Sequence, residues 1–293
     1  YIFKTENFKR FGYKIGTGLK VFGISYNNLA KYKVYYPQEI EEQEKIIGIL
    51  SNLTNSINLH ERKCEELALI KKALLQKLFP KKDEIKPEVR YKNFSDAWEQ
   101  RKFSEILAKS DGLRRGPFGS ALKKEFFISS SEYTVYEQNN AIYNTWKTRY
   151  FITPEKFQEL HKFQLVPGDF ILSGAGTIGR IAQVPANITK GVFNQALIRI
   201  RINPEWMDKN FFLIWMQSEN MQRKLTQANP GSAMTNLVPM SEIKKWEIII
   251  PSKAEQNKIG EFIQKLNSLI TLHQRKLERL KQLKKFLLQN MFI

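Results

Sequence analysis

Two stretches of the chain carry apolar residues at the spacing of a long α-helix. In residues 39–80, and again in residues 252–293, apolar positions recur in steps of three, four and seven, which places them on one face of a helix. These positions are Ile46, Leu50, Leu53, Ile57, Cys64, Leu67, Leu74 and Leu78 in the first stretch and Ile259, Ile263, Leu266, Ile270, Leu277, Leu280, Leu287 and Met291 in the second. No glycine or proline interrupts either stretch after Gly48 or Gly260, so each predicts one helix of about 40 residues, roughly 60 Å long.

The two stretches are copies of each other. Residues 39–79 align with residues 252–292 at a constant shift of 213, and 18 of the 41 aligned positions are identical. The likeness continues upstream, so that a strand ending in Pro37 or Pro251 is predicted before each helix. This period is far longer than that of stacking repeats, so the repeated object is a domain followed by a helix. A lone helix with an apolar stripe needs a partner, and the two copies predict an antiparallel, coiled-coil-like pair.

Two polar positions interrupt the stripes. His60 and His273 are equivalent in the repeat and lie beside the seam, where a polar contact that sets the register is favoured over a metal site, because no second ligand stands in register. Cys64 occupies the place of Leu277 in the other copy, which indicates a small core residue and not a nucleophile.

The residues between the long helices predict a globular domain of mixed structure. Strands are expected at residues 169–173, 180–184 and 193–201, and helices at residues 154–161 and 204–225. A charged connector bounded by prolines, residues 80–87, precedes this domain. The expected fold is therefore α/β (mixed α+β), with globular domains separated by the antiparallel helices. Its parts are residues 1–38, the C-terminal remnant of a first domain, 39–80, the first long helix, 81–92, a linker, 93–251, the second domain, and 252–293, the second long helix.

Composition narrows the class of protein. The formal net charge is +18, and an excess of this size is typical of a protein that binds phosphate, although ribosome, RNA or acidic-membrane binding could also produce it. One cysteine and three histidines exclude a disulfide framework and multi-cysteine zinc sites, which fits a reducing cytoplasm. No apolar run approaches the ~20 residues that span a bilayer. The chain begins at Tyr1 without an initiator methionine, so this start looks internal. The first copy of the repeat ends near Pro80 although the period is 213 residues, so its domain is expected to be truncated.

One motif suggests a nucleotide site, and its context argues against one. Gly174–Gly179 matches the dinucleotide pattern GxGxxG, but the following Arg180–Val184 reads as a strand that stops at Pro185, where the fingerprint requires a helix. A tight turn between two strands is the better interpretation, and its exposed amides, with Ser173, Thr177 and Arg180, could still meet a DNA phosphate. No Walker loop, methyltransferase motif, paired-histidine metal motif or nuclease carboxylate cluster is evident, so no catalytic residue or metal ligand is assigned.

Several polar and basic loops are candidates for DNA contact. Residues 109–124 cluster cations around glycines and a serine, and amides elsewhere have the groups that pair with adenine edges, although ordinary turn chemistry explains those amides equally well. The candidates are Arg114, Arg115, Gly119, Ser120, Lys123, Lys124, Gln138, Asn139, Asn140, Ser173, Thr177, Arg180, Ser232 and Asn236. Aromatic residues fill cores more often than they stack on bases, so none is assigned.

The repeated segments are similar to a known family. A proline, Glu-Gln-x-Lys-Ile, a long helix and a terminal Leu-Leu-Gln-x-[Leu/Met]-Phe occur in both copies, and they resemble the conserved regions of type I restriction–modification specificity subunits. Residues 94–102, 168–179 and 193–195 are also similar to that family, which adds Asn194 and Gln195 to the candidates for DNA contact.

The resemblance implies a non-catalytic, cytoplasmic, DNA-binding subunit. In that family two target-recognition domains each read half of a bipartite double-stranded target, and two antiparallel helices set their spacing and dock methyltransferase subunits. S-adenosylmethionine, ATP and Mg are then expected on the methyltransferase and restriction/translocase partners, and no cofactor on this chain. Self-association through the long helices is a further expectation. With one domain truncated, this chain alone should read half a site.

Two other classes of function stay open. A stand-alone DNA methyltransferase or nuclease would need a cofactor pocket or carboxylate set that the sequence does not display. A basic helical scaffold that binds nucleic acid without specificity would show steep salt dependence and no sequence preference.

Overall fold

The computed structural model describes residues 1–18, 23–81, 84–226 and 239–291. The chain divides into two compact units, one made of residues 1–70 and 266–293 and the other of residues 71–265. Both long helices contribute to both units, because the division falls within them.

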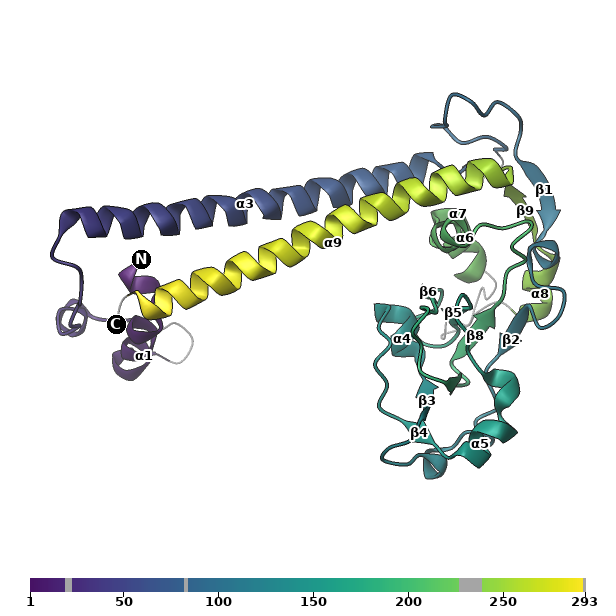
Figure 1. Cartoon of the computed structure of the whole chain (residues 1–293), viewed down its shortest axis with the longest axis horizontal. Helices are drawn as coiled ribbons and strands as arrows, with labels where there is room; N and C mark the ends of the chain where they lie inside the picture. The colour runs from purple at the N-terminus through teal and green to yellow at the C-terminus, as the bar shows by residue number, and fades with distance from the viewer. Residues whose placement is uncertain (19–22, 82–83, 227–238, 292–293) are drawn as a thin grey trace. The chain divides into compact units, whose positions relative to one another are not determined.

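The first unit is built on the long helices predicted from the apolar pattern. α3 spans Ile40–Lys77 and α9 spans Lys253–Asn290, and their parts within this unit run side by side in opposite directions (Figure 1). The predicted stripes supply the buried apolar residues of these parts, which are Ile46, Leu50, Leu53, Ile57 and Leu266. The expected antiparallel helical pair is thus confirmed, and its packing stabilises helices whose apolar stripes could not be buried alone.

Polar contacts fix the register of this pair. Lys284 Nζ donates to Thr54 Oγ1 at 2.8 Å, and Lys281 forms an ion pair with Glu61 at 2.7 Å. The predicted contact between the repeated histidines is also present, with Nδ1 of His60 and Nδ1 of the second-copy histidine 2.8 Å apart. These two residues are equivalent in the repeat, so a local twofold relation between the copies passes between their rings.

The N-terminal residues of this unit form short elements, which are η1 (Ile2–Lys4), α1 (Glu6–Ile15) and α2 (Tyr26–Leu29). Thr5 caps α1 by accepting a hydrogen bond from the Phe8 amide. The prediction of a strand before Pro37 is wrong, because residues 32–37 form no strand. Its counterpart, β9 (Glu247–Ile250), is a strand because it pairs with β1 (Glu99–Lys102), and the repeat offers no equivalent of β1 to the first copy within this sequence.

The second unit has the mixed α and β structure that the sequence predicts. Its remaining strands are β2 (Leu113–Arg115), β3 (Tyr133–Tyr136), β4 (Phe151–Ile152), β5 (Phe170–Ser173), β6 (Ile181–Gln183), β7 (Gly191–Phe193) and β8 (Leu197–Ile200). An antiparallel sheet has the order β2-β8-β5-β6, and a second sheet has the order β4-β3-β7, in which β3 and β7 are parallel. The helical elements are η2 (Phe103–Ile106), η3 (Lys124–Phe126), α4 (Gln138–Tyr143), α5 (Pro154–Glu159), η4 (His161–Phe163), α6 (Lys209–Met216), α7 (Glu219–Thr226) and α8 (Met240–Lys245).

The main core of this unit contains side chains of the four-stranded sheet and of α6. Phe170 of β5 packs edge-on against Phe212 of α6, with ring centroids 4.8 Å apart. The same cluster of buried residues includes Phe103, Leu172, Ile198, Ile200, Phe211, Trp215, Ile248, Ile259 and Ile263. Burial of these large apolar side chains is the main stabilising contribution in this unit.

Two predicted elements are each divided in the structure. The helix expected at residues 204–225 starts five residues later, where the Asp208 carboxylate caps the amides of Asn210 and Phe211, and it is divided at residues 217–218 into α6 and α7. The strand expected at residues 193–201 is the end of β7 and the whole of β8, with a turn closed by a bond from the Leu197 amide to the Asn194 carbonyl. Since β7 and β8 belong to different sheets, this turn lies where the chain passes from one sheet to the other.

Candidate nucleic-acid interface

Three loops far apart in the sequence meet at one end of the four-stranded sheet. Gly116 follows β2, and its amide donates to the Leu197 carbonyl at 2.9 Å. A Cβ atom at Gly116 would lie 1.9 Å from the Asn194 carbonyl oxygen, so only glycine permits this approach. The amide of Gly174, after β5, donates to the Ala196 carbonyl at 2.8 Å. Backbone contacts therefore hold the three loops together.

The glycine-rich segment is the tight turn that its context predicts. Residues 174–180 join the antiparallel strands β5 and β6, and Ser173 Oγ closes the turn by donating to the Thr177 carbonyl at 2.6 Å and accepting from the Arg180 amide at 2.9 Å. The Gln138 side chain of α4 donates to the carbonyls of Ala175 and Thr177. A strand follows the last glycine, so the turn lacks the helix N-terminus that a dinucleotide site uses.

Beside these loops lies an open groove of about 1130 Å³, here called the basic groove. Its lining comes from β2 and the loops around it, from η4, from the turns at 175 and 195–196, and from α8. The polar and aromatic residues of the lining are Ser104, Lys109, Asp111, Arg114, Arg115, Phe118, Lys162, Phe163, Gln195 and Lys244. Five of these side chains are cationic and one is acidic, so the groove attracts anions.

Four of the cations have free charges. Within the part of the chain that the structure describes, no carboxylate pairs with Lys109, Arg115, Lys162 or Lys244, and all four are exposed. Lys123, in the same stretch of sequence as Lys109 and Arg115, instead pairs with Glu125 at 3.5 Å. Unpaired cations along an open groove suit phosphate groups, because binding releases counterions without breaking an internal ion pair.

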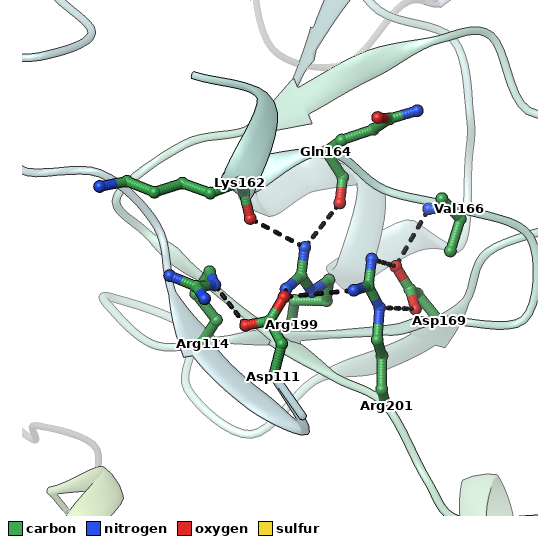
Figure 2. Close-up of polar contacts among 8 residues, drawn as sticks. All are labelled: Asp111, Arg114, Lys162, Gln164, Val166, Asp169, Arg199 and Arg201. Carbon is green, nitrogen blue, oxygen red and sulfur yellow. Dashed lines mark hydrogen bonds and ion pairs between the residues drawn. The ribbon is translucent and has the colours of Figure 1, made fainter. Parts of the chain in front are cut away.

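Two residues of the groove lining, Asp111 and Arg114, belong to a network of arginines and aspartates that sequence patterns do not reveal (Figure 2). Arg114 and Arg199 stand directly opposite each other on β2 and β8, and like charges in this position are destabilising unless a counter-charge intervenes. Asp111 supplies it by pairing with both, and it also contacts Arg201 at 3.2 Å. Asp169 completes the network by pairing with Arg201 at 2.7 Å.

Arg199 is the centre of this network and is only 1% exposed. Its guanidinium donates to the carbonyls of Lys162 at 3.1 Å and Gln164 at 2.7 Å, which fixes the segment that carries Lys162 into the groove. Burial, followed by repulsion from Arg201, lowers the pKa of Arg199 from its ordinary value, and Asp111 opposes that shift. The network therefore ties β2, β8 and η4 together beneath the basic groove.

The structure places four of the sequence candidates in the groove, namely Arg114, Arg115, Gly119 and Gln195. Seven others lie outside its lining, and of these Ser120, Lys123, Lys124, Asn139, Thr177 and Arg180 are exposed and Asn194 is half-buried. Gln138 is half-buried and its amide holds the glycine turn. Ser232 and Asn236 lie outside the described residues.

Two candidates are removed from the interface by their burial. Asn140 is 3% exposed, and its side chain caps α4 and donates to the carbonyls of Thr145 and Lys147. Ser173 is fully buried and its hydroxyl is used inside the glycine turn. Both side chains support loops and have no free group to offer DNA in this conformation.

Four groove residues were missed by sequence reasoning. Lys162 follows α5 and Lys244 is on α8, so only tertiary packing brings them to β2. Lys109 belongs to the basic stretch of residues 109–124, but it was not among the predicted DNA-contact residues. Phe118 belongs to it too, and the general preference of aromatics for cores argued against it.

Two negative findings apply to the described residues. They contain no group of three or more histidine, cysteine, aspartate or glutamate side chains arranged to hold a metal ion. None of the helices within the described ranges has the length and apolar character that crossing a membrane requires.

Comparison with known proteins gives one consistent result. The family model described as type I restriction modification DNA specificity domain matches residues 96–282. The Type I restriction enzyme MjaVIII specificity subunit of Methanocaldococcus jannaschii is 23% identical over 258 residues, covering 84% of this chain and 58% of that protein. This chain thus spans about three fifths of the length of that curated relative.

Solved structures share the fold. The S subunit of a type I restriction-modification system from M. genitalium has a TM-score of 0.59 at 14% identity, over 98% of this chain and 72% of that one. The HsdS subunit from Thermoanaerobacter tengcongensis has a TM-score of 0.56 at 14% identity, over 95% of this chain and 66% of that one. At this identity the likeness supports the mixed domain and the paired long helices as a common architecture.

Proposed function

Because this chain belongs to the family of type I restriction modification DNA specificity domains, we propose that it binds double-stranded DNA through the basic groove and reads half of a bipartite target. The observation that carries the proposal is the gathering of four unpaired cations from four separate segments into one open groove. The stretch 109–115, Lys162 and Lys244 are far apart in the sequence, so the fold, and not a run of basic residues, brings the four cations together.

The groove offers both kinds of group that DNA reading requires. Lys109, Lys162 and Lys244 present flexible point charges suited to phosphates. Arg115 is exposed beside them, and a free guanidinium pairs bidentately with a guanine edge. The side chain of Gln195, also exposed, has the donor and acceptor that match adenine.

The proposal extends to the rest of the complex. The second half-site would be read by another recognition domain, and the exposed faces of the α3–α9 pair would dock methyltransferase and restriction/translocase subunits. This chain contributes specificity and no catalytic group. S-adenosylmethionine, ATP and Mg are then held by the partner subunits.

The test is selection from random duplex DNA by the chain mixed with its cognate methyltransferase subunit. We expect enrichment of one half-site, or of a discontinuous sequence if a second recognition domain is present, together with S-adenosylmethionine-dependent methylation of the selected DNA. Salt-sensitive binding without enrichment would contradict sequence reading and indicate a nonspecific scaffold instead. Methylation or cleavage by the chain without partners would contradict its non-catalytic role.

A further inference from the structure

Phe118 stands out on the surface of the second unit. It is 88% exposed, the highest value for a large apolar side chain among the described residues. Folding gains nothing from a phenyl ring in this position, because the ring stays in water. A single exposed apolar residue is ordinary on most surfaces, but this one lies on a groove whose charged side chains are mainly cationic.

The loop that carries Phe118 is held at both ends. On one side Gly116 is pressed against the Asn194 carbonyl, and the buried ring of Pro117 restricts the next backbone angle. On the other side the Phe118 carbonyl accepts from the Ala121 amide at 2.9 Å, and Leu122 is buried at 4% exposure. The ring is therefore presented by a fixed loop, so little conformational entropy is lost when it contacts a ligand.

The cations around the Phe118 ring indicate the kind of ligand that the ring contacts. Arg115 precedes it by three residues and, with Lys109 and Lys162, lines the same groove without a carboxylate partner. These cations suit a polyanion, whereas a phenyl ring gains nothing from phosphate. Duplex DNA satisfies both, since its charged backbones border a stack of apolar base faces. Apolar side chains inserted between base pairs unstack a step and kink the duplex.

We propose that Phe118 is a wedge that inserts between adjacent base pairs of the DNA held in the basic groove. This inference rests on the proposed DNA-binding function and adds to it a deformation step. At the inserted step, sequences are then distinguished by the free energy needed to unstack the two base pairs, without a hydrogen bond to the base edges. Pyrimidine–purine steps such as TA would be favoured because they kink most easily.

The experiment compares the full-length chain with its Phe118→Ala variant on one mixed-sequence duplex, prepared either fully paired or with one mismatched base pair. A mismatch lowers the cost of unstacking, so a wedge binds it more tightly. We expect the wild-type chain to prefer the mismatched duplex roughly fivefold or more, as base–aromatic stacking allows, and the variant to lose this preference. A 2-aminopurine beside the mismatch should brighten further on binding of the wild-type chain only.

Tyr143→Ala is the matched control, because Tyr143 is 73% exposed in the same unit and does not line the groove. It should behave as the wild type does. Phe118→Leu keeps an apolar wedge and should keep part of the preference. The wedge proposal is overturned if the wild-type chain binds both duplexes with equal affinity, or if the Phe118→Ala variant loses affinity for both duplexes by the same factor. Neither outcome contradicts the proposed DNA binding. Failure of the wild-type chain to bind either duplex contradicts the proposed function itself.

Discussion

A single carboxylate, that of Asp111, neutralises arginines from two strands. Asp111 has a φ of 60°, a left-handed conformation that aspartate and asparagine adopt more readily than other side chains. It is the acidic member of the groove lining, and it pairs with the buried Arg199. The position of Asp111 thus requires a residue that tolerates a left-handed backbone and that carries a negative charge to pair with Arg199.

Asp111→Asn separates these two requirements, since it keeps the backbone preference and the shape but removes the charge. The buried Arg199 then loses its closest carboxylate, and we expect the free energy of unfolding of the second unit to fall by about 3 kcal/mol. All five tryptophans lie within residues 71–265, so urea unfolding followed by tryptophan fluorescence reports this unit. The control is Glu125→Gln, whose exposed pair with Lys123 should be worth under about 0.5 kcal/mol. Equal effects of the two variants would show that the network does not stabilise the fold.

At the scale of elements, the two copies of the repeat share the contact of one residue at the start of each long helix and differ in the contact of the residue before it. Gln43 Nε2 donates to the Pro37 carbonyl at 2.8 Å, and Gln256 Nε2 donates to the Pro251 carbonyl at 2.9 Å, so the glutamine fixes the entry into each helix in the same way. The preceding glutamates differ. Glu255 is fully buried and pairs with Arg90 through two hydrogen bonds of 2.7 Å, whereas Glu42 is exposed.

Glu255→Gln should therefore destabilise the second unit, whereas Glu42→Gln should not. Loss of one partner leaves the Arg90 guanidinium, 15% exposed, without its counter-charge, and we expect about 3 kcal/mol less stability. The measurement is urea unfolding followed by far-ultraviolet circular dichroism, because Glu42 lies in the first unit, which has no tryptophan, and both units contain helix. The substitution at Glu42 removes the same charge from the equivalent position of the other copy. A similar loss in both variants would indicate an effect of helix-terminal charge and not of the ion pair.

At the contact between the repeated histidines, we expect the stability of the helices of the first unit to depend on pH. Burial lowers the pKa of His60 from its ordinary value of 6.5, and Lys276, His273 and Lys63 add repulsion. A lowered pKa means that the unfolded chain binds the proton more tightly, so stability is full above about pH 6.5 and falls as the pH drops towards the folded-state pKa.

His60→Asn should flatten this dependence, because asparagine does not titrate and keeps a polar group beside His273. The measurement is the thermal midpoint of helix loss, followed by far-ultraviolet circular dichroism between about pH 8 and pH 5. His161→Gln is the control, since His161 is exposed and should leave the slope of the wild type unchanged. An identical slope in all three proteins would rule out the histidine pair as its source.

Sequence patterns predicted the elements better than they predicted the site. The helical stripes and the glycine turn depend on local spacing, so they were read correctly. The later start of α6 depends on the Asp208 cap, and the missing strand before Pro37 depends on a partner strand, and local spacing encodes neither. Arg114 and Arg115 were found because they are neighbours in sequence. Lys162 and Lys244 were not, because β2 meets η4 and α8 only in the folded domain.

At the scale of the whole molecule, the net charge of +18 alone would attract DNA, so binding by itself does not identify an interface. The salt dependence of binding does, because each phosphate contact contributes about 0.9 to the slope of log affinity against log salt concentration. Replacing Lys109, Arg115, Lys162 and Lys244 together with alanine should reduce that slope by roughly 3, because the three lysines are proposed to meet phosphates and Arg115 a base edge.

The decisive comparison is a second variant with the same change in net charge. Lys190, Lys209, Lys258 and Lys265 are exposed and do not line the groove, so their replacement by alanine lowers the overall field as much without touching the proposed contacts. We expect this variant to slow association slightly and to keep nearly the whole slope, as measured by fluorescence anisotropy over a salt series. If both variants lost the slope equally, attraction would come from net charge, and the basic groove would not be the surface that holds DNA.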